Sequence, residues 1–461
     1  MSTKPSFSYI DLFAGCGGLS LGFERSGAEL VLAVERSPMA AETFRHNLIE
    51  PVKSESEWAD YVASPISEQV SKGLLVKELQ YLLDEPQLVD DLAHHEIDVI
   101  AGGPPCQGFS LAGRRNPEDL RNQLPWQFLQ FVEKVSPKIV VIENVVGMRH
   151  KFSADQPEPV FDQLQQALRE TGLGYEVQAV EVNAMHYGAP QHRPRLMIIG
   201  LRADIAEAKG IKSSGNLWKS NFLNLIADPI PAMAPSPTVT ENESPNLGDA
   251  LNDLITPQGA QSTNSKRFVA EMKDAQAWGL KNSNMVLKNH IRRNHTEQAS
   301  SRFELYQALL ALGFDAKIIS KAAAMTETHA KKYLLEHFAT AKFPAKTPSG
   351  KVLASSPQEL TDLVWKLRTK KHSQRVLPMD KVARTVVTIG DDYVHPIEPR
   401  TFTVRELARF QGFPDSFEFR AKETTGGLNR RNEVPQYSQV GNAVSPFLAR
   451  AVGELIRNLL N

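Results

Sequence analysis

The sequence predicts an α/β fold in which helices cover both faces of a mostly parallel sheet. A short apolar run at residues 9–13 leads into a glycine loop, a helical stretch follows this loop, and a second apolar run occupies residues 30–35. A strand, a glycine loop, a helix and a second strand in this order are typical of the opening unit of such a sheet.

Later segments supply the remaining elements of this sheet. Strands are predicted at residues 98–103, 138–145, 175–184 and 195–201, and a helix at about 159–170. The last two strands flank a polar loop, "MHYGAPQHRP". We therefore expect residues 1–201 to form the first domain.

The composition changes after this domain. Residues 202–265 are rich in Pro, Ser and Asn, which predicts loops or a linker, and the basic stretch that follows has a helical pattern near 301–312. A final helix is expected from Pro446, with Ser445 as its N-cap and one apolar face.

The chain thus divides into three expected parts. They are a first domain at 1–201, a middle region at 202–380 that includes the linker, and a C-terminal segment at 381–461 that packs back onto the first domain.

The overall composition is that of a soluble globular protein. The 461 residues are 41% hydrophobic and 23% charged, which suits two or three domains with cores of their own. No apolar run approaches the ~18 residues of a membrane span, and no secretory signal is expected. Two cysteines form no disulfide framework and suit a reducing compartment. We expect a cytoplasmic protein with no membrane partner.

The charge is unevenly distributed along the chain. Residues 1–110 hold 7 Lys and Arg against 17 Asp and Glu, a net charge of −10, whereas residues 261–375 hold 20 against 9, a net charge of +11. A localised basic segment is expected of a face that binds a polyanion. The alternative is a basic surface that is merely solvated.

The glycine loop "DLFAGCGG" indicates a cofactor site. Gly15, Gly17 and Gly18 do not form the G-x-G-x-x-G fingerprint, but glycines at a strand-to-helix turn allow positive φ and a close ligand. Glu35 ends the next strand, where a carboxylate can accept hydrogen bonds from ribose hydroxyls. These residues favour an adenosine-containing cofactor over a simple tight turn.

The segment "AGGPPCQGFS" places Cys106 where α/β folds bind ligands, after the end of a predicted strand. Two prolines restrict the backbone before the thiol, and a fixed, accessible thiol suits covalent catalysis. The alternative is a small apolar residue at a turn.

Two further segments carry polar groups at strand ends. Glu143 and Asn144 end a neighbouring strand, and the alternative there is an acid in solvent. Gln191, Arg193 and Arg195 alternate, so in an extended segment they share a face. Their alternative is a charged edge that prevents aggregation.

Five motifs in one order resemble those of cytosine-5 DNA methyltransferases. They are the glycine loop, Pro-Cys, Glu-Asn-Val, Gln-x-Arg-x-Arg and a late "QVGNAV", and the resemblance covers about residues 8–201 and 380–461. It implies a Rossmann-like fold that uses S-adenosylmethionine, with a smaller target-recognition domain in the middle region. It also implies a bacterial DNA cytosine methylase of the restriction–modification type.

The resemblance assigns roles to individual residues. Cys106 is the implied nucleophile, Glu143 binds the amidine edge of cytosine, and Arg193 and Arg195 lie near the base. The residues implied to contact S-adenosylmethionine are Phe13, Gly15, Gly17, Gly18, Glu35, Pro105, Leu124 and Asn442. The candidates for DNA contact are Gln107, Ser110, Gln191, Arg292 and Arg293. A structural turn is the equal alternative for Arg292 and Arg293.

The chemistry explains these residue types. Addition of the Cys106 thiolate at C6 activates C5 toward the methyl group, and Glu143 must hold a proton at N3. The base must be flipped out of the duplex, and no metal is required. The expected partners are double-stranded DNA and a cognate restriction endonuclease encoded nearby, and the protein is expected to be a monomer.

One family feature has no clear counterpart here, an aspartate after the third strand that meets the adenine. Residues 48–97 are long and acidic, and Asp60 and Ser64 are the candidates. Two other functions remain open: a tRNA cytosine-5 methyltransferase, or a catalytically silent DNA-binding regulator on the same scaffold.

Overall fold

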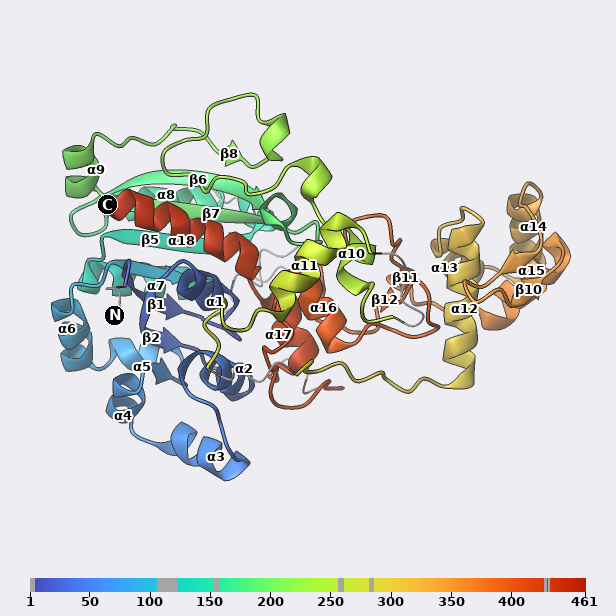
Figure 1. The fold of residues 1–461 in the computed structure, drawn as a ribbon, viewed down its shortest axis with the longest axis horizontal. Coiled ribbons are helices and arrows are strands. Elements are labelled where there is room, and N and C mark those ends of the chain that lie inside the picture. The colour runs from blue at the N-terminus through green and yellow to red at the C-terminus, as the bar shows by residue number, and fades with distance from the viewer. Residues whose placement is uncertain are drawn as a thin grey trace.

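A sheet of eight strands, counted over the residues that the structure describes, forms the centre of the molecule (Figure 1). The structure is a computed structural model, and it describes residues 5–105, 123–151, 158–255, 261–281, 286–426, 429 and 432–461. The strands are β1 (Ser8–Leu12), β2 (Glu29–Val34), β3 (Leu74–Leu75), β4 (Val99–Gly102), β5 (Ile139–Val145), β6 (Tyr175–Asn183), β7 (Pro194–Arg202) and β8 (Trp218–Lys219). Their order is β3-β2-β1-β4-β5-β7-β6-β8.

Most neighbouring strands run parallel, as the sequence predicts. The pairs β3–β2, β2–β1, β1–β4, β4–β5 and β6–β8 are parallel. Strand β7 is antiparallel to both of its neighbours, β5 and β6. The carboxyl ends of β2, β1, β4 and β5 therefore meet at one edge of the sheet.

Helices cover both faces of this sheet. They include α1 (Gly18–Arg25), α2 (Pro38–Phe44), α3 (Glu55–Ala63), α4 (Ile66–Ser71), α5 (Leu79–Leu83), α6 (Pro86–His94), α7 (Leu124–Val135), α8 (Val160–Glu170) and α18 (Pro446–Leu460). Tyr9 packs in one buried cluster with α1 and α18, whereas its neighbour Ile10 packs in another with α7 and α8. Successive side chains of a strand point to opposite faces, so each face of β1 has its own core.

Helix α18 returns from the end of the chain to lie against α1 (Figure 1). Gly22 makes this approach possible, because a Cβ there would collide with Ala449 and with the backbone of Pro446 and Arg450. Gly453 faces Ser26 in the same way. The final helix begins at Pro446, as the sequence predicts.

Residues 202–255 and 261–265 pack against the first domain instead of spanning open space. Met233, Leu247 and Ala250 are fully buried in the cluster that also holds α1 and α18. Short helices occur here, α9 (Ala203–Lys209) and α10 (Leu247–Leu251), followed by α11 (Thr263–Lys273). The segment's few apolar residues are enough to anchor a chain that is otherwise rich in loop-forming residues.

A second lobe has its own core at the opposite end of the molecule (Figure 1). Its elements are α12 (Glu297–Ala311), α13 (Lys317–Ala322), α14 (Glu327–Phe338), β9 (Ala345–Lys346), β10 (Val352–Ala354), α15 (Pro357–Leu367), β11 (Arg375–Val376) and β12 (Tyr393–Val394). Phe303, Leu334 and Leu360 are at the centre of its buried cluster. Helices α16 (Val404–Gln411) and α17 (Gln436–Asn442) follow and lead back to the first domain.

Asp11 of β1 is buried beneath the glycine loop, and its Oδ2 accepts a hydrogen bond of 2.6 Å from Ser20 Oγ. Burial raises the pKa of Asp11 to about 7, and the Ser20 hydrogen bond opposes this rise. The folded protein therefore binds this proton more tightly than the unfolded chain does. The stability that Asp11 contributes is present below about pH 4 and is lost as the pH rises to about 7.

The variant Asp11→Asn is expected to remove this pH dependence, because an amide can still accept from Ser20 and does not ionise. Between about pH 5 and 7 the wild type should lose up to about 1.4 kcal/mol per pH unit relative to the variant. Urea unfolding of both proteins across this range measures the difference. Parallel stability curves would contradict the assignment.

Candidate active site

The carboxyl edge of the sheet brings together residues that lie far apart in the sequence. Leu12 pairs with Val34 on one side and with Gly102 on the other, and Gly102 pairs with Ile142. The residues that follow these positions therefore lie side by side at this edge. They include Phe13, Glu35, Gly103 and Glu143, all of which the sequence places at or beside the predicted site.

The glycine loop has the backbone geometry that its sequence predicts. Phe13, Gly15 and Gly17 have φ values of 60°, 58° and 95°. A Cβ on Gly18 would collide with the carbonyl oxygen of Val444, whereas a Cβ on Gly15 would meet no atom within 4 Å. The loop is thus packed on its inner side and open at Gly15, where a ligand has room to approach the backbone.

Glu35 is held against this loop by two backbone amides. Gly15 N donates to Glu35 Oε2 at 2.9 Å, and Ser37 N donates to Oε1 at 2.7 Å. Burial raises the pKa of Glu35 above its usual value, and the two amide donors oppose the rise. The carboxylate lies at the open side of the loop, which fits the predicted contact with a ribose.

Three other residues of the predicted cofactor site are at least partly exposed to solvent. Asn442 is exposed at the end of α17, Pro105 is exposed, and Leu124 at the start of α7 is half-buried. Together with the loop, these residues fit an adenosine-containing group. Their contact with S-adenosylmethionine stays a prediction.

Glu143 and Arg195 form an ion pair at the end of β5. Arg195 Nε lies 2.8 Å from Glu143 Oε1, and the two side chains are only 11% and 12% exposed. A Cβ on Gly103 would lie 2.9 Å from Glu143 Oε2, so the start of the "GGPPC" segment runs directly beside the carboxylate. Asn144 Nδ2 donates to Pro104 O at 2.9 Å. The acid and the start of this segment are therefore fixed relative to one another.

Cys106, Gln107 and Ser110 lie outside the described residues. The described chain extends to Pro105 and begins again at Gln123. The roles predicted for these three residues stay predictions.

Gln191 and Arg193 are buried, whereas the sequence pattern places them on one face with Arg195. Gln191 Nε2 donates to Gln411 Oε1 at 2.9 Å, and its Oε1 accepts from Val386 N at 2.7 Å. Arg193 donates to the carbonyls of Gly441 and Ala443 at 2.9 and 2.8 Å. A direct contact of either residue with DNA would require these hydrogen bonds to break.

The position of the third strand shows that neither candidate for the adenine-contacting residue follows this strand, as the family pattern requires. Strand β3 is Leu74–Leu75, and Val76, Lys77 and Glu78 follow it. Asp60 lies on α3 and Ser64 just after it, before the strand begins. A two-residue strand gives little signal in the sequence, although Gly73 and the apolar run after it mark its start.

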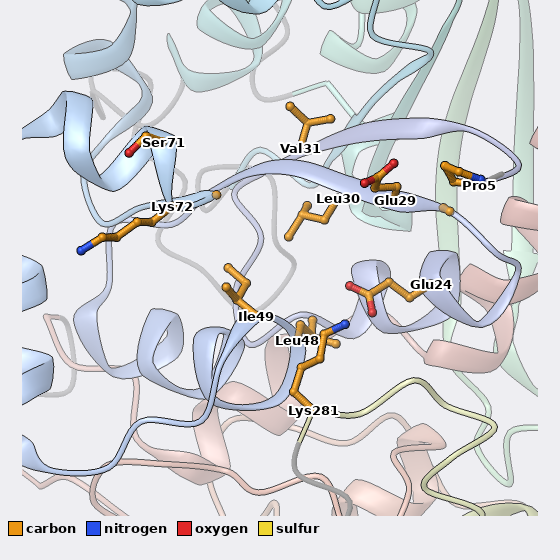
Figure 2. Close-up of a pocket in the computed structure, with 12 residues that line it drawn as sticks. Pro5, Glu24, Glu29, Leu30, Val31, Leu48, Ile49, Ser71, Lys72 and Lys281 are labelled. Carbon is orange, nitrogen blue, oxygen red and sulfur yellow. The ribbon is translucent and has the colours of Figure 1, made fainter. Parts of the chain in front are cut away.

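A cavity of about 590 Å³ lies at the opposite, amino-terminal end of β2 (Figure 2). Its walls include Glu24, Leu30, Lys72 and Lys281. Burial raises the pKa of Glu24 to about 7, and the charge of Lys281 opposes this. The cavity is therefore separate from the carboxyl edge that carries the predicted site.

The described part of the chain contains neither a group of side chains suited to a metal ion nor a helix suited to spanning a membrane. It holds no cluster of three or more His, Cys, Asp or Glu side chains suited to a metal ion. None of the helices in that part has the length and apolar character needed to cross a membrane.

Comparison with known families now identifies the chain. A family model described as C-5 cytosine-specific DNA methylase matches residues 7–458. The chain belongs to this family. The predicted resemblance, the fold class and the activity of a DNA cytosine-5 methyltransferase are thereby confirmed.

Relatives of the methylase align along almost their whole length. Type II methyltransferase M.DdeI of Desulfomicrobium norvegicum is 29% identical over 447 residues, which cover 97% of this chain and 88% of that protein. Type II methyltransferase M1.HphI of Haemophilus parahaemolyticus is 28% identical over 454 residues, which cover 98% and 87%. A crystal structure described as a DNA modification methyltransferase from an E. coli prophage has a TM-score of 0.54 at 21% identity and 99% coverage of both chains, which supports the fold.

The basic segment of the methylase around residues 288–295 runs along the C-terminal elements. Arg292 pairs with Glu398 at 3.0 Å, and Arg293 pairs with Asp391 at 2.6 Å. His290 Nδ1 lies 3.0 Å from Thr403 Oγ1. These contacts are those expected if Arg292 and Arg293 hold a structural turn. Contact of the two arginines with DNA stays a prediction.

The variant Asp391→Asn distinguishes a structural role of Arg293 from a role in DNA contact. If the ion pair holds the segment in place, Asp391→Asn and Arg293→Gln should each lower the unfolding free energy by about 1 kcal/mol and weaken DNA binding alike. This is the expected result, because the pair is short and partly buried. Thermal unfolding and a DNA-binding titration measure it, with the exposed Asp380→Asn as the control. Tighter DNA binding by Asp391→Asn would instead indicate that Arg293 contacts DNA.

Proposed function

We propose that this methylase transfers a methyl group from S-adenosylmethionine to C5 of a cytosine flipped out of duplex DNA, through a covalent bond between Cys106 Sγ and C6. The observation that carries the proposal is the Glu143–Arg195 pair beside Gly103 and Pro104, at the sheet edge that also holds the glycine loop. S-adenosylmethionine, when bound, supplies an electrophilic methyl group.

The Glu143–Arg195 pair matches one edge of cytosine. The ring presents two adjacent acceptors, O2 and N3, and an amino group at C4. Arg195 can donate to O2, while a protonated Glu143 can donate to N3 and accept from the amino group through its other oxygen. Arg195 Nε lies 2.8 Å from Glu143 Oε1, so the two side chains are adjacent, as the adjacent O2 and N3 atoms of the ring require.

Cys106 follows the segment that Asn144 and Glu143 hold in place. The Asn144 amide fixes the carbonyl of Pro104, two residues before the thiol in the sequence. Addition of the thiolate to C6 forms the S–C6 bond and moves the electron pair of the C5–C6 double bond to C5. A proton from Glu143 at N3 stabilises the charge that this addition places on the ring. After methylation, loss of the C5 proton to solvent, return of the N3 proton to Glu143 and expulsion of the thiolate restore the double bond.

The biological role that fits is protection of DNA from a partner endonuclease. The relatives M.DdeI and M1.HphI are type II methyltransferases, and the chain covers most of the length of each. Bisulfite sequencing of DNA from a host that expresses the methylase would give the target sequence. Digestion of that DNA with an endonuclease of the same specificity tests protection.

The variant Cys106→Ala is expected to abolish methyl transfer, because the attack on C6 has no replacement. Wild-type protein should form a stable adduct with a duplex that carries 5-fluorocytosine at the target, and Cys106→Ala should form none. Electrophoresis under denaturing conditions measures the adduct. The buried Cys16, whose pKa burial raises to about 12, supplies the control Cys16→Ala, which should still form it. Methylation by Cys106→Ala would disprove the covalent route.

The variant Glu143→Gln is expected to lower the rate of methyl transfer by roughly 10²–10⁴-fold, since an amide cannot deliver a proton to N3. Single-turnover methylation with radiolabelled S-adenosylmethionine measures the rate, and DNA affinity is measured separately. A wild-type rate in this variant would contradict the role of Glu143.

The same assay distinguishes the two other functions. Duplex DNA and tRNA are offered in parallel to the wild type. Methylation of tRNA alone would indicate a tRNA methyltransferase, and DNA binding without methylation would indicate a silent regulator.

A further inference from the structure

The second lobe carries a cavity of about 190 Å³ between α13, α14 and the loop before α13. Its walls are formed by Phe314, Asp315, Lys317, Ile318, Lys321, Tyr333 and His337. None of these residues belongs to the predicted cofactor, catalytic or DNA sites. We call this cavity the α13–α14 pocket.

Two lysines form one wall of the pocket. Lys317 and Lys321 are exposed and lie one turn apart on α13, and neither has a carboxylate within ion-pair distance over the described residues. Asp315 also lines the pocket, where its Oδ1 accepts a hydrogen bond of 2.8 Å from the backbone N of Lys317, so the two lysines and this carboxylate together give the lining a net positive charge. Like charges at this spacing repel one another on a helix, so an anion between them would be stabilising.

Aromatic rings form the opposite wall. Tyr333 and His337 are one turn apart on α14, with ring centroids 4.0 Å apart. His337 Nδ1 lies 2.8 Å from the carbonyl oxygen of Tyr333, so this nitrogen is the donor. Phe314 is fixed by an edge-to-face contact with Phe338 at 5.2 Å. The pocket therefore pairs a net positive charge with a mainly apolar surface of aromatic rings.

The size of the pocket limits what it can hold. Sites that enclose a small-molecule ligand usually measure about 300–1,000 Å³, which is larger than this one. A single phosphate group with part of its sugar fits better: the phosphate contacts the lysines and the sugar lies against the rings. Backbone phosphates of DNA present this combination at every nucleotide.

The position and charge of the lobe agree with such a ligand. Residues 297–376 hold 13 Lys and Arg against 7 Asp and Glu, a net charge of +6. Figure 1 shows α13 on the side of the lobe toward the catalytic domain, with α14 and α15 farther out. A duplex held between the two lobes would therefore pass α13.

We propose that the α13–α14 pocket binds one backbone phosphate of the DNA and anchors the second lobe without reading its sequence. This inference rests on the proposed function, in which duplex DNA is the substrate. It assigns Lys317 and Lys321 to the phosphate and Tyr333 to the adjacent sugar. Each phosphate contact releases counterions, so its signature is a change in the salt dependence of binding.

The test compares the full-length variant Lys317→Ala/Lys321→Ala with a control of equal charge change. The control is Lys331→Ala/Lys351→Ala, because Lys331 pairs with Glu327 at 2.9 Å and Lys351 pairs with Glu304 at 2.8 Å on the same lobe. DNA affinity is measured by fluorescence anisotropy on duplexes with and without the target sequence. Equal unfolding temperatures of both variants and the wild type establish that all are folded.

The pocket variant is expected to reduce the slope of log affinity against log salt by about 0.9, the value for one phosphate contact, equally on both duplexes. Its affinity deficit relative to the wild type should then narrow about 3.5-fold between about 50 and 200 mM salt. The control should keep the wild-type slope, and Lys317→Arg/Lys321→Arg should restore it. Tyr333→Ala should weaken binding to both duplexes alike.

Three results would overturn the inference. An unchanged slope in the pocket variant would show that the lysines contact no phosphate, and an equal loss in the control would indicate a general effect of charge. A loss confined to the duplex with the target sequence would indicate contact with a base. In each case methylation of duplex DNA by the wild type would remain, whereas its absence would contradict the proposed function itself.

Discussion

The buried guanidinium group of Arg193 is the interaction on which the candidate active site depends. It lies at the start of β7 and donates to the carbonyls of Gly441 and Ala443, at the end of α17. Burial and the nearby charge of Arg195 lower the pKa of Arg193. A charge in such surroundings is costly unless its hydrogen bonds are well formed. The junction between the first domain and the C-terminal segment is therefore held in one geometry.

The contacts of Arg193 position the residues proposed to bind the base and also those proposed to bind the cofactor. Arg195 is two residues beyond Arg193 and pairs across the sheet with Val145, which brings it to Glu143. Asn442 stands between the two residues whose carbonyls Arg193 binds, and Val444 just after them packs against Gly18 of the glycine loop, so the same contact sets the position of Asn442. One buried side chain thus relates the groups proposed for the base to those proposed for the cofactor.

The second lobe depends on a different set of contacts. Gln307 of α12 donates to the carbonyls of His395 and Glu398, and Arg400 forms a buried pair with Glu406 of α16. The lobe is therefore joined to the C-terminal elements through the segment around residues 391–400. The ion pairs of Arg292 and Arg293 end on this segment as well. Val394 of the same segment is fully buried in the apolar cluster of the lobe, so hydrogen bonds, ion pairs and apolar packing together hold the lobe to the C-terminal elements.

The sequence by itself determined the parallel sheet, the glycine loop and the meeting of Glu35 and Glu143 at one edge. These follow from local patterns, because strand ends and glycine turns are encoded by neighbouring residues. The sequence did not predict that Gln191 and Arg193 are buried under the C-terminal segment whereas Arg195 reaches Glu143. Alternation places the three residues on one face, but it does not show which part of that face another segment covers. The short β3 and the ion pairs of Arg292 and Arg293 also required the tertiary structure. Their partners lie about 40 to 110 residues away, and long-range contacts of this kind leave no local signal.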